Sequence, residues 1–348
     1  MAIHDAFPEV VKTESALEEL LSRPYPELVE LMRRLEGDVA ILGIAGKMGV
    51  SMGAMAVRAV RASGVPRTVY GVSRFTDPAA RAAVEAQGGV ALRCDLLARA
   101  AVAKLPDVPN VVFMAGRKFG TGGGESLTWA MNAWMPGVVC ERYAASRIVA
   151  FSTGCVYPLV PAASGGCRES DAPAPIGEYA QSCLGRERVF EHFSRTAGTR
   201  ICLLRLNYAL DLRYGVLHDL ARAVWEGRPV NRAVDSFNGI WQGDANNQAL
   251  LALEHGASPA AILNLTGPET VSVTQTAETF GRLLDRPVSF AGEPGDRAYL
   301  SNASEAFRRF GHPRVTLAQT VRWTAEWIRN GGRSLDKPTH FDVADGQY

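Results

Sequence analysis

Short apolar runs alternate with amphipathic stretches along the first two thirds of the chain, and each kind of segment predicts one kind of element. The apolar runs indicate buried strands at residues 38–42, 68–72, 89–94, 110–114, 147–151 and 201–206. Stretches with helical spacing lie between them, at residues 50–57, 76–87, 96–104, 125–145 and 177–196. Strands that alternate with helices form a parallel sheet with helices on both faces. The pattern therefore predicts a doubly wound α/β fold, with ligands beyond the carboxyl ends of its strands.

A glycine-rich turn follows the first expected strand. Gly43, Gly46 and Gly49 are spaced three apart, with Lys47 and Met48 between the last two, and a helix-forming stretch comes next. Backbone without side chains can approach a pyrophosphate closely, and a helix N-terminus supplies aligned N–H groups and the positive end of a dipole. The sequence of strand, turn and helix predicts a dinucleotide site and a Rossmann-type domain; the alternative is a tight turn without a ligand.

The end of the second expected strand bears on which dinucleotide binds. An NAD site commonly has an acidic residue here, which accepts hydrogen bonds from the ribose 2′-OH. This chain has Ser73 and Arg74 instead, and an arginine can pair with a 2′-phosphate. We therefore expect NADP to be favoured over NAD; the alternative is that Arg74 is a solvated surface charge.

The two ends of the chain have less regular patterns. Residues 1–37 indicate a helical extension used for packing or assembly, with Ser15 and Glu18 fitting a capping box and a second helix from Pro26. Beyond the last strand, helices are expected at 215–227, 244–255, 273–284, 302–310 and 316–330, and short strands at 262–265 and 287–290.

These segments predict two domains. We expect a dinucleotide-binding domain over residues 38–207 and a smaller C-terminal α/β substrate domain over 208–330, interleaved with the first. Trp323 and Trp327 are expected in a core, and residues 331–348 are expected to form an extended tail.

Composition and charge narrow the function. Apolar residues make up 47% of the 348 residues, charged residues 21%, and the net charge is +1. These values are typical of a soluble globular protein and give no electrostatic case for a nucleic acid or membrane partner. The six cysteines show no metal-ligand spacing, so we expect reduced thiols, no metal site and a cytoplasmic location. No leader peptide and no apolar run of about 18 residues is visible.

The order of the motifs resembles the NAD-dependent epimerase/dehydratase family of the extended short-chain dehydrogenase/reductase superfamily. The resemblance spans about residues 38–330. It rests on the glycine turn, on Asp95-Leu96 after strand three, on the Phe-Met-Ala-Gly end of strand four, on Ser152-Thr153-x-x-Val-Tyr after strand five, and on a helix with Tyr179. The loop from Ala115 to Ser126 is similar to that of UDP-galactose epimerases.

The resemblance implies a role for each matching residue. Asn132 would order a proton relay, Thr153 would hydrogen-bond the substrate oxygen, and Tyr179 would exchange its proton, with Ser152 beside them in the catalytic set. The implied cofactor-binding residues are Gly43, Gly46, Lys47, Met48, Gly49, Ser73, Arg74, Asp95, Leu96, Ala115, Gly116, Lys118 and Tyr179. The implied substrate-binding residues are Lys118, Cys155 and Asn207. A homodimer formed by the helices at 125–145 and 177–196 is also implied.

One departure from the family affects catalysis. The family has a lysine four residues after the tyrosine, and this chain has Cys183 there. A tyrosine that acts as a base at pH 7 needs its pKa lowered by about 3, or about 4 kcal/mol, and one nearby cation supplies about 1–3 of those units. Three alternatives follow: Lys118 or Arg186 replaces the lysine, the tyrosine acts only as an acid or hydrogen-bond donor, or redox chemistry has been lost.

A second departure affects the substrate. Relatives that use nucleotide sugars hold the diphosphate with an arginine where this chain has Ser236-Phe237-Asn238, although Arg213 or Arg232 could compensate. We therefore expect an NAD(P)-dependent oxidoreductase or epimerase that acts on a secondary alcohol of a sugar or sugar acid without a nucleotide. The alternative is a non-catalytic dinucleotide-binding sensor or regulatory protein.

Overall fold

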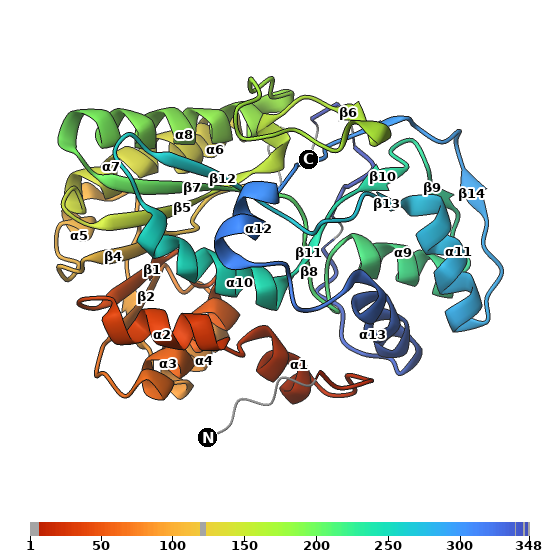
Figure 1. The fold of residues 1–348 in the computed structure, drawn as a ribbon, viewed down its shortest axis with the longest axis horizontal. Coiled ribbons are helices and arrows are strands. Elements are labelled where there is room, and N and C mark those ends of the chain that lie inside the picture. The colour runs from red at the N-terminus through yellow and green to blue at the C-terminus, as the bar shows by residue number, and fades with distance from the viewer. Residues whose placement is uncertain (1–6, 119–122, 338, 344, 347–348) are drawn as a thin grey trace.

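A seven-stranded parallel sheet forms the centre of the molecule (Figure 1). The structure, a computed structural model, describes residues 7–118, 123–337, 339–343 and 345–346. The sheet has the order β12-β7-β5-β4-β1-β2-β3, and each neighbouring pair is parallel. Its strands are β1 (Val39–Leu42), β2 (Val69–Ser73), β3 (Val90–Arg93), β4 (Asn110–Phe113), β5 (Arg147–Thr153), β7 (Arg200–Leu206) and β12 (Ala261–Leu265). The predicted doubly wound α/β fold is confirmed.

Helices cover both faces of this sheet, because alternate residues of each strand point to opposite sides. Val39 and Ile41 of β1 belong to a core shared with α2 (Pro26–Arg34), α3 (Gly49–Ser63) and α10 (Gln242–Leu251). Ala40 and Leu42 belong to the opposite core, shared with α5 (Arg99–Val102), α7 (Met135–Arg142) and α8 (Gly177–Ala197). Helix α4 (Pro78–Ala86) packs beside β3.

Several predicted boundaries are wrong. The helix expected at 125–145 consists of α6 (Glu125–Trp129), a π-helical turn (Ala130–Trp134) and α7. A π-turn inserts one residue into the helical repeat, so a pattern with a period of 3.6 does not reveal it. The helix expected at 96–104 is only the short α5, because Asp95 holds the chain in a turn by accepting the Leu97 N–H at 3.0 Å.

The N-terminal cap was also assigned to the wrong residue. Thr13, not Ser15, caps α1 (Glu14–Leu21), since its hydroxyl accepts the Ala16 N–H at 3.1 Å. The helix expected at 244–255 starts earlier and ends in a 3₁₀ turn, and the strand expected at 287–290 is β14 (Phe290–Ala291).

A second group of elements lies beside the carboxyl ends of the main sheet (Figure 1). The helices α9 (Val216–Trp225), α11 (Val273–Leu284) and α13 (Leu317–Arg329) share a core around Phe237 and Phe280. Short strand pairs surround it: β8 (Ala209–Leu210) with β11 (Ile240–Trp241), β9 (Val230–Asn231) with β14, β10 (Ser236–Phe237) with β13 (Val271–Ser272), and β6 (Val160–Pro161) with β15 (Arg297–Ala298). Between these segments, α10, β12 and α12 (Ser304–Phe310) return to the main sheet.

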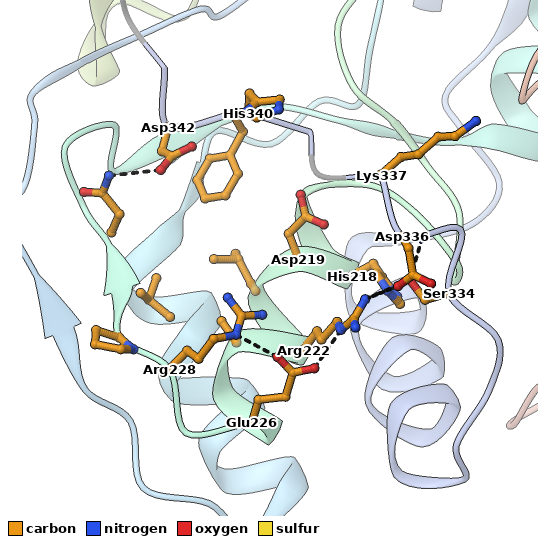
Figure 2. A pocket seen from close by; sticks show the side chains of 16 residues that line it. His218, Asp219, Arg222, Glu226, Arg228, Ser334, Asp336, Lys337, His340 and Asp342 are labelled. Atoms are coloured by element: carbon orange, nitrogen blue, oxygen red, sulfur yellow. Dashed lines mark hydrogen bonds and ion pairs between the residues drawn. The ribbon is translucent and has the colours of Figure 1, made fainter. Parts of the chain in front are cut away.

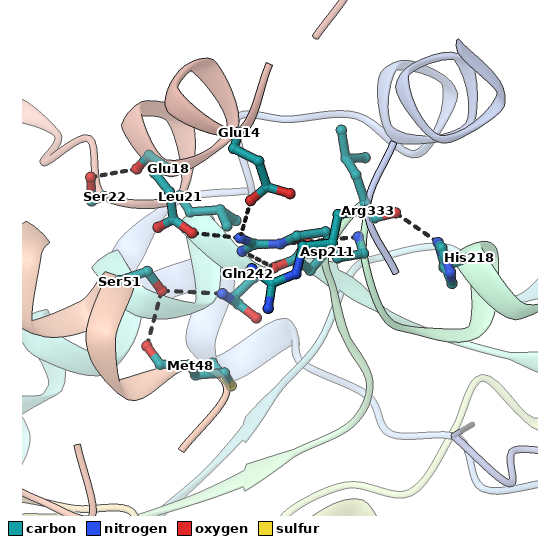
Figure 3. Close-up of polar contacts among 12 residues, drawn as sticks. Glu14, Glu18, Leu21, Ser22, Met48, Ser51, Asp211, His218, Gln242 and Arg333 are labelled. Atoms are coloured by element: carbon teal, nitrogen blue, oxygen red, sulfur yellow. Dashed lines mark hydrogen bonds and ion pairs between the residues drawn. The ribbon is translucent and has the colours of Figure 1, made fainter. Parts of the chain in front are cut away.

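The N-terminal extension joins the two groups. The Arg213 guanidinium, 8% exposed, binds Asp211 at 2.8 Å and reaches Glu14 at 3.0 Å and Glu18 at 2.5 Å on α1 (Figure 3). Leu17 and Leu21 pack in the same cluster as Trp241, Trp323 and Trp327, so the expected burial of the two C-terminal tryptophans is confirmed. The extension therefore fixes the loop between β8 and α9.

The C-terminal segment after α13 has no helix or strand over its described residues, and it folds back across the molecule. The Leu335 N–H donates to the Arg213 carbonyl at 3.0 Å, and Phe341 packs in the α9 core with 8% exposure. Near its end Gly346 touches Gly177, the first residue of α8. This segment thus passes from the smaller core to the helix that carries Tyr179.

Two observations concern the classes of protein considered above. No helix among the described residues is long and apolar enough to cross a membrane. In the same part of the chain, no cluster of His, Cys, Asp and Glu side chains fits a metal ion, and none of the six cysteines forms a disulfide.

Candidate active site

A cavity of about 240 Å³ lies at the carboxyl ends of β1, β2 and β4. Most of the expected cofactor-binding residues come together around it. Its lining consists of Gly43, Ala45, Gly46, Ser73, Arg74, Thr76, Cys94, Asp95, Leu96, Leu97, Met114, Ala115, Gly116, Met131 and Met135.

The three glycines of the turn have different structural requirements. Gly43 has φ +94°, and a Cβ there would lie 2.6 Å from the Ala115 nitrogen. A Cβ on Gly49 would lie 2.2 Å from the Ile44 carbonyl oxygen, so this glycine permits close packing of α3 on the turn. Gly46 is exposed, and its nearest neighbour would be 3.4 Å away. Its open side and the α3 N-terminus, which no described side chain caps, suit a pyrophosphate. The residues present therefore fit a dinucleotide.

A second cavity of about 180 Å³ adjoins the turn on its other side. Of the expected site residues it contains Lys47, Met48, Lys118, Ser152, Thr153, Cys155, Tyr179 and Asn207. The remaining lining was not expected from the sequence: Leu206, Tyr208, Ala209, Tyr214, Gly215, Gln242 and Thr339. The Lys47 and Lys118 side chains thus lie in the same cavity as Tyr179; from the sequence, Lys47 was assigned to the cofactor and Lys118 to both the cofactor and the substrate.

The Tyr179 hydroxyl lies beside Thr153, at the end of β5, and the two side chains share a hydrogen bond. Burial raises the pKa of Tyr179 well above its usual 10, and the neighbouring Cys183 and Cys155 thiols add to the rise. The Arg186 charge and the bond to Thr153 act in the opposite direction without reversing it. Tyr179 is therefore a protonated phenol at neutral pH and is arranged as a proton donor.

Arg186 is a buried cation whose charge lowers the pKa of Tyr179, which is the effect expected of the missing lysine. It lies two helical turns after Tyr179 on α8 and is buried. Its guanidinium donates to the Phe151 carbonyl and to the Asn132 Oδ1, each at 2.7 Å. A Cβ on Gly116 would lie 2.3 Å from the same guanidinium, so a glycine at that position leaves room for it.

Asn132 occupies the π-helical turn and connects several of these groups. Its amide nitrogen donates to the Arg117 carbonyl and to the Ser182 hydroxyl, both at 2.9 Å, and its oxygen accepts the Arg117 N–H at 2.9 Å. The side chain is fully buried. Because the π-turn sets the direction of this side chain, α6 and α7 position the Arg186 guanidinium through Asn132.

Cys183 provides no charge at this site. It is 1% exposed in a cluster with Val156, Tyr157 and Cys167. Burial raises the pKa of its thiol to about 11, although Arg186 opposes the rise. The side chain is therefore a neutral thiol.

A network of buried hydrogen bonds begins at Ser152, one of the residues that line the second cavity. The Ser152 hydroxyl donates to Glu187 at 2.5 Å, and Glu187 pairs with Arg205 at 2.7 Å. Arg205 donates to the Tyr157 hydroxyl at 2.7 Å, which donates to Asn264 at 2.8 Å. The Ser152 hydroxyl therefore donates to Glu187, in a network that connects β5 with β7 and β12.

The unexpected residues come from the second group of elements. Tyr208 has φ +38°, an uncommon conformation for a non-glycine residue, at the point where β7 leaves the sheet. Gln242 begins α10, and its amide donates to Ser51 at 3.1 Å (Figure 3). Thr339 comes from the C-terminal segment. Near Gln242 the sequence drew attention only to Ser236-Phe237-Asn238, and nothing in the sequence indicated Thr339.

Arg213 and Arg232, the two arginines that could compensate for the missing diphosphate clamp, both bind other groups of the protein. Arg213 is held by Asp211 and α1. Arg232 donates to the Gly292 carbonyl at 3.0 Å and packs on Phe290. Asn238, in the region of the clamp, accepts from Asn207 at 2.6 Å and donates to the Ser301 carbonyl at 2.7 Å.

This sheet, its glycine turn and the tyrosine cavity beside it define a class of dinucleotide-binding proteins with a doubly wound fold. The sequence profile of the NAD dependent epimerase/dehydratase family matches residues 39–209. Residues 39–209 therefore have the sequence of this family, and the protein is an enzyme, which favours catalysis over the non-catalytic sensor. No curated protein sequence matches the chain.

Solved structures share the fold over nearly their whole length. UDP-glucose 4-epimerase from Thermotoga maritima is 17% identical with a TM-score of 0.69, over 84% of this chain and 99% of that chain. dTDP-glucose 4,6-dehydratase from Streptomyces venezuelae is 20% identical with a TM-score of 0.71, over 84% and 97%. UDP-glucuronic acid 4-epimerase from Bacillus cereus is 16% identical with a TM-score of 0.69, over 84% and 99%.

Proposed function

We propose that this enzyme is an NAD(P)-dependent oxidoreductase or epimerase that acts on a secondary alcohol of a carbohydrate without a nucleotide. The observation that carries the proposal is the Thr153–Tyr179 pair, which faces a small cavity next to the cavity that fits a dinucleotide. A carbohydrate hydroxyl or carbonyl at this pair would be within reach of both cavities.

The residues would divide the work as follows. Gly46, Asp95 and Ala115 would hold the dinucleotide, whose nicotinamide ring supplies or accepts a hydride when bound. Thr153 would orient the reacting substrate oxygen, and Tyr179 would donate its proton to that oxygen during carbonyl reduction. In the opposite direction the phenolate would take the proton back, and the Arg186 charge would favour that phenolate.

The absence of a nucleotide in the substrate is supported by three features. Ser236-Phe237-Asn238 stands where relatives have the diphosphate-binding arginine, and Arg213 is paired with Asp211 and Glu14. The cavity of about 180 Å³ is smaller than the range of about 300–1,000 Å³ common for drug-sized ligands. The C-terminal segment covers it through Thr339. The Thermotoga maritima and Bacillus cereus relatives were solved with UDP-sugars, so this enzyme would differ from them in substrate.

A preference for NADP is supported by Arg74, which is exposed at the rim of the dinucleotide cavity next to Ser73 and Thr76. Its guanidinium would pair with a 2′-phosphate. If so, Arg74→Ala weakens NADP binding at least tenfold and leaves NAD binding unchanged in a fluorescence titration; equal effects on both would refute the preference.

A homodimer is supported by the apolar surface of the α6–α7 region. Leu127, Trp129 and Trp134 are 42%, 38% and 57% exposed, and Ile176, just before α8, is 39% exposed. Large apolar side chains gathered on one face are typical of an interface. Sedimentation of the native protein and of Trp134→Glu tests this: a monomeric native protein would contradict it.

Replacement of the reacting pair tests the proposed function directly. We expect Tyr179→Phe and Thr153→Val each to reduce turnover of the identified carbohydrate by about 10²–10⁴, as for loss of general acid–base catalysis, with dinucleotide binding retained. Tyr143→Phe is the matched control, because the Tyr143 hydroxyl bonds the Pro106 carbonyl away from the cavity. Unchanged turnover in both active-site variants would show that the assignment is wrong.

A further inference from the structure

We propose that the second cavity binds a carboxylate between Lys47 and Lys118, so that the substrate is a sugar acid. This inference rests on the proposed function and specifies its substrate class. It is argued from the charged residues of the cavity, which the proposed function does not use.

The charge of the lining is one-sided. Among the fifteen described residues that line the cavity, Lys47 and Lys118 are the only charged side chains, and the others are neutral. The polar neutral groups, such as Asn207, Gln242 and Thr339, suit hydroxyls. A carboxylate would bring a negative charge between the two lysines, whereas a neutral sugar would offer them only hydroxyl oxygens.

The two ammonium groups reach the cavity from different elements of the dinucleotide-binding part. Lys47 extends from the turn between β1 and α3, and its Nζ lies 2.9 Å from the centre of the Tyr214 ring. Lys118 follows β4, and its Nζ donates to the Thr339 carbonyl at 3.3 Å and lies 5.9 Å from the centre of the Tyr179 ring. A group held by both lysines would therefore place the rest of the molecule against Tyr179.

Lys118 is close enough to Lys47 to affect its pKa. Burial lowers the pKa of Lys47 to about 7, and the charges of Lys118 and then Lys337 lower it further, while Asp219 and Asp211 oppose the change. Burial also lowers the pKa of Lys118. Asp219 is held by Thr339 at 2.6 Å and Asp211 by Arg213 at 2.8 Å. An anion between the lysines would relieve this repulsion and stabilise both charges.

A helix terminus adds to the positive potential. Gly215 lines the cavity and precedes α9, so the first turn of α9 faces it. No described side chain caps this turn. The positive end of the helix dipole thus lies at the edge of the cavity, and Asp219 in the first turn of α9 offsets part of it.

The chemistry of the site favours a carboxylate over a phosphate or diphosphate. Planar arginines commonly hold phosphates through two hydrogen bonds, and no arginine lines this cavity over the described residues. Arginines occur instead in a neighbouring cavity of about 580 Å³ beyond Asp219 and the C-terminal segment (Figure 2). There Arg222 is paired with Glu226 at 2.7 Å and Asp336 at 2.5 Å, and Arg228 with Glu226 at 2.7 Å.

The test compares substrates that differ in one group. Hexuronates and hexonates would each be assayed against the neutral sugar or alditol of the same configuration, together with hexose phosphates and UDP-hexoses. Dinucleotide reduction would be followed by absorbance, and epimer formation by chromatography. We expect the best acid to exceed its neutral partner at least 100-fold in kcat/KM. We expect Lys47→Met and Lys118→Met to raise the KM for the acid at least tenfold, and to change the KM for the matched neutral sugar or alditol less than twofold.

Controls separate charge from folding. Lys12→Met and Lys104→Met remove exposed lysines outside the cavity and should leave the KM unchanged. Lys47→Arg should restore much of the affinity that Lys47→Met loses. If a methionine variant does not fold, acylation of the native protein by an amine reagent near pH 7.5 gives a second measurement: Lys47 should be modified faster than Lys12, and the best acid should protect it.

The outcomes also separate this inference from the proposed function. Turnover of neutral sugars as good as that of acids, with unchanged KM in both methionine variants, would overturn the carboxylate site and leave the proposed function intact. Turnover of hexose phosphates but not acids would overturn the carboxylate and retain the anion site. Turnover of UDP-hexoses only, or no hydride transfer with any carbohydrate, would overturn the proposed function itself.

Discussion

Tyr179 determines how the rates of the two reaction directions depend on pH. Burial keeps the pKa of its phenol above the usual 10, so the proton-donating form is fully present below pH 9 and the phenolate is rare. Carbonyl reduction uses the phenol, and alcohol oxidation uses the phenolate. We expect the reduction rate to be constant between about pH 6 and 8 and the oxidation rate to rise, by up to about tenfold per pH unit.

Single-turnover rates in both directions, measured across this pH range with saturating substrate and dinucleotide, check this prediction. Such rates exclude product release from the comparison. An oxidation rate that is already constant below pH 7 would mean that the enzyme–substrate complex holds Tyr179 as a phenolate, contrary to the proposed role.

Cys183 occupies the position of the family lysine, and restoring a lysine there should not improve the enzyme. The ammonium would be enclosed beside the Arg186 guanidinium, in a cluster that holds Val156, Tyr157 and Cys167. An uncompensated buried charge costs several kcal/mol. We expect Cys183→Lys to lower both the midpoint of thermal unfolding and the turnover.

Cys183→Ser is the matched control and should keep most of both properties. The measurements are thermal unfolding with bound dinucleotide and initial rates on the same preparation. A gain in oxidation rate in Cys183→Lys would show that Arg186 does not take over from the lysine.

At the scale of elements, the parallel strands were predictable and the special turns were not. Short apolar runs such as 110–114 and 147–151 identified central strands because buried parallel strands are apolar on both faces. The π-turn at Asn132 was not predictable, since one inserted residue barely changes helical spacing. Tyr214 and Thr339 were missed as site residues because the contacts that bring them to the cavity are made by segments far away in the sequence.

The C-terminal segment is an element without regular structure, and its attachment depends on a few contacts. Phe341 anchors it in the α9 core, and the Thr339 N–H and hydroxyl donate to Asp219 at 2.8 and 2.6 Å. We expect Phe341→Ala to release the segment: KM should rise at least fivefold and amide exchange near Thr339 should accelerate, while the main sheet keeps its protection.

Val343→Ala alters a less buried side chain of the same segment and serves as the control. The comparison uses hydrogen exchange followed by mass spectrometry, and initial rates with the identified substrate. A Phe341→Ala protein with native exchange and native KM would show that the segment does not cover the cavity in solution.

At the scale of the whole molecule, Arg213 ties the N-terminal extension to the substrate loop. Removing it would leave Asp211, which is 4% exposed, without its cation. Breaking a buried ion pair costs about 3–5 kcal/mol, whereas an exposed one contributes about 0–1 kcal/mol. We expect Arg213→Ala to lower the free energy of unfolding by about 3–5 kcal/mol. Arg222→Ala, whose ion pairs are half exposed, should lower it by about 0–1 kcal/mol.

Denaturant unfolding of the two variants in parallel, followed by tryptophan fluorescence, measures both values. The Trp241–Trp323 contact, with ring centres 5.4 Å apart, lies in the cluster that α1 covers and reports on this region. Equal losses for the two variants would contradict a special role of Arg213 in joining the extension to the loop.

The two walls of the tyrosine cavity are built very differently. Ser152 in its lining is joined by buried hydrogen bonds to Glu187 of α8 and through it to Arg205 of β7, whereas Thr339 comes from a segment without regular structure. We therefore expect substrate and product to pass on the side of the C-terminal segment, so that each turnover moves that segment through solvent. A higher solvent viscosity, obtained with sucrose, would then lower the steady-state turnover rate and leave the rate of hydride transfer unchanged.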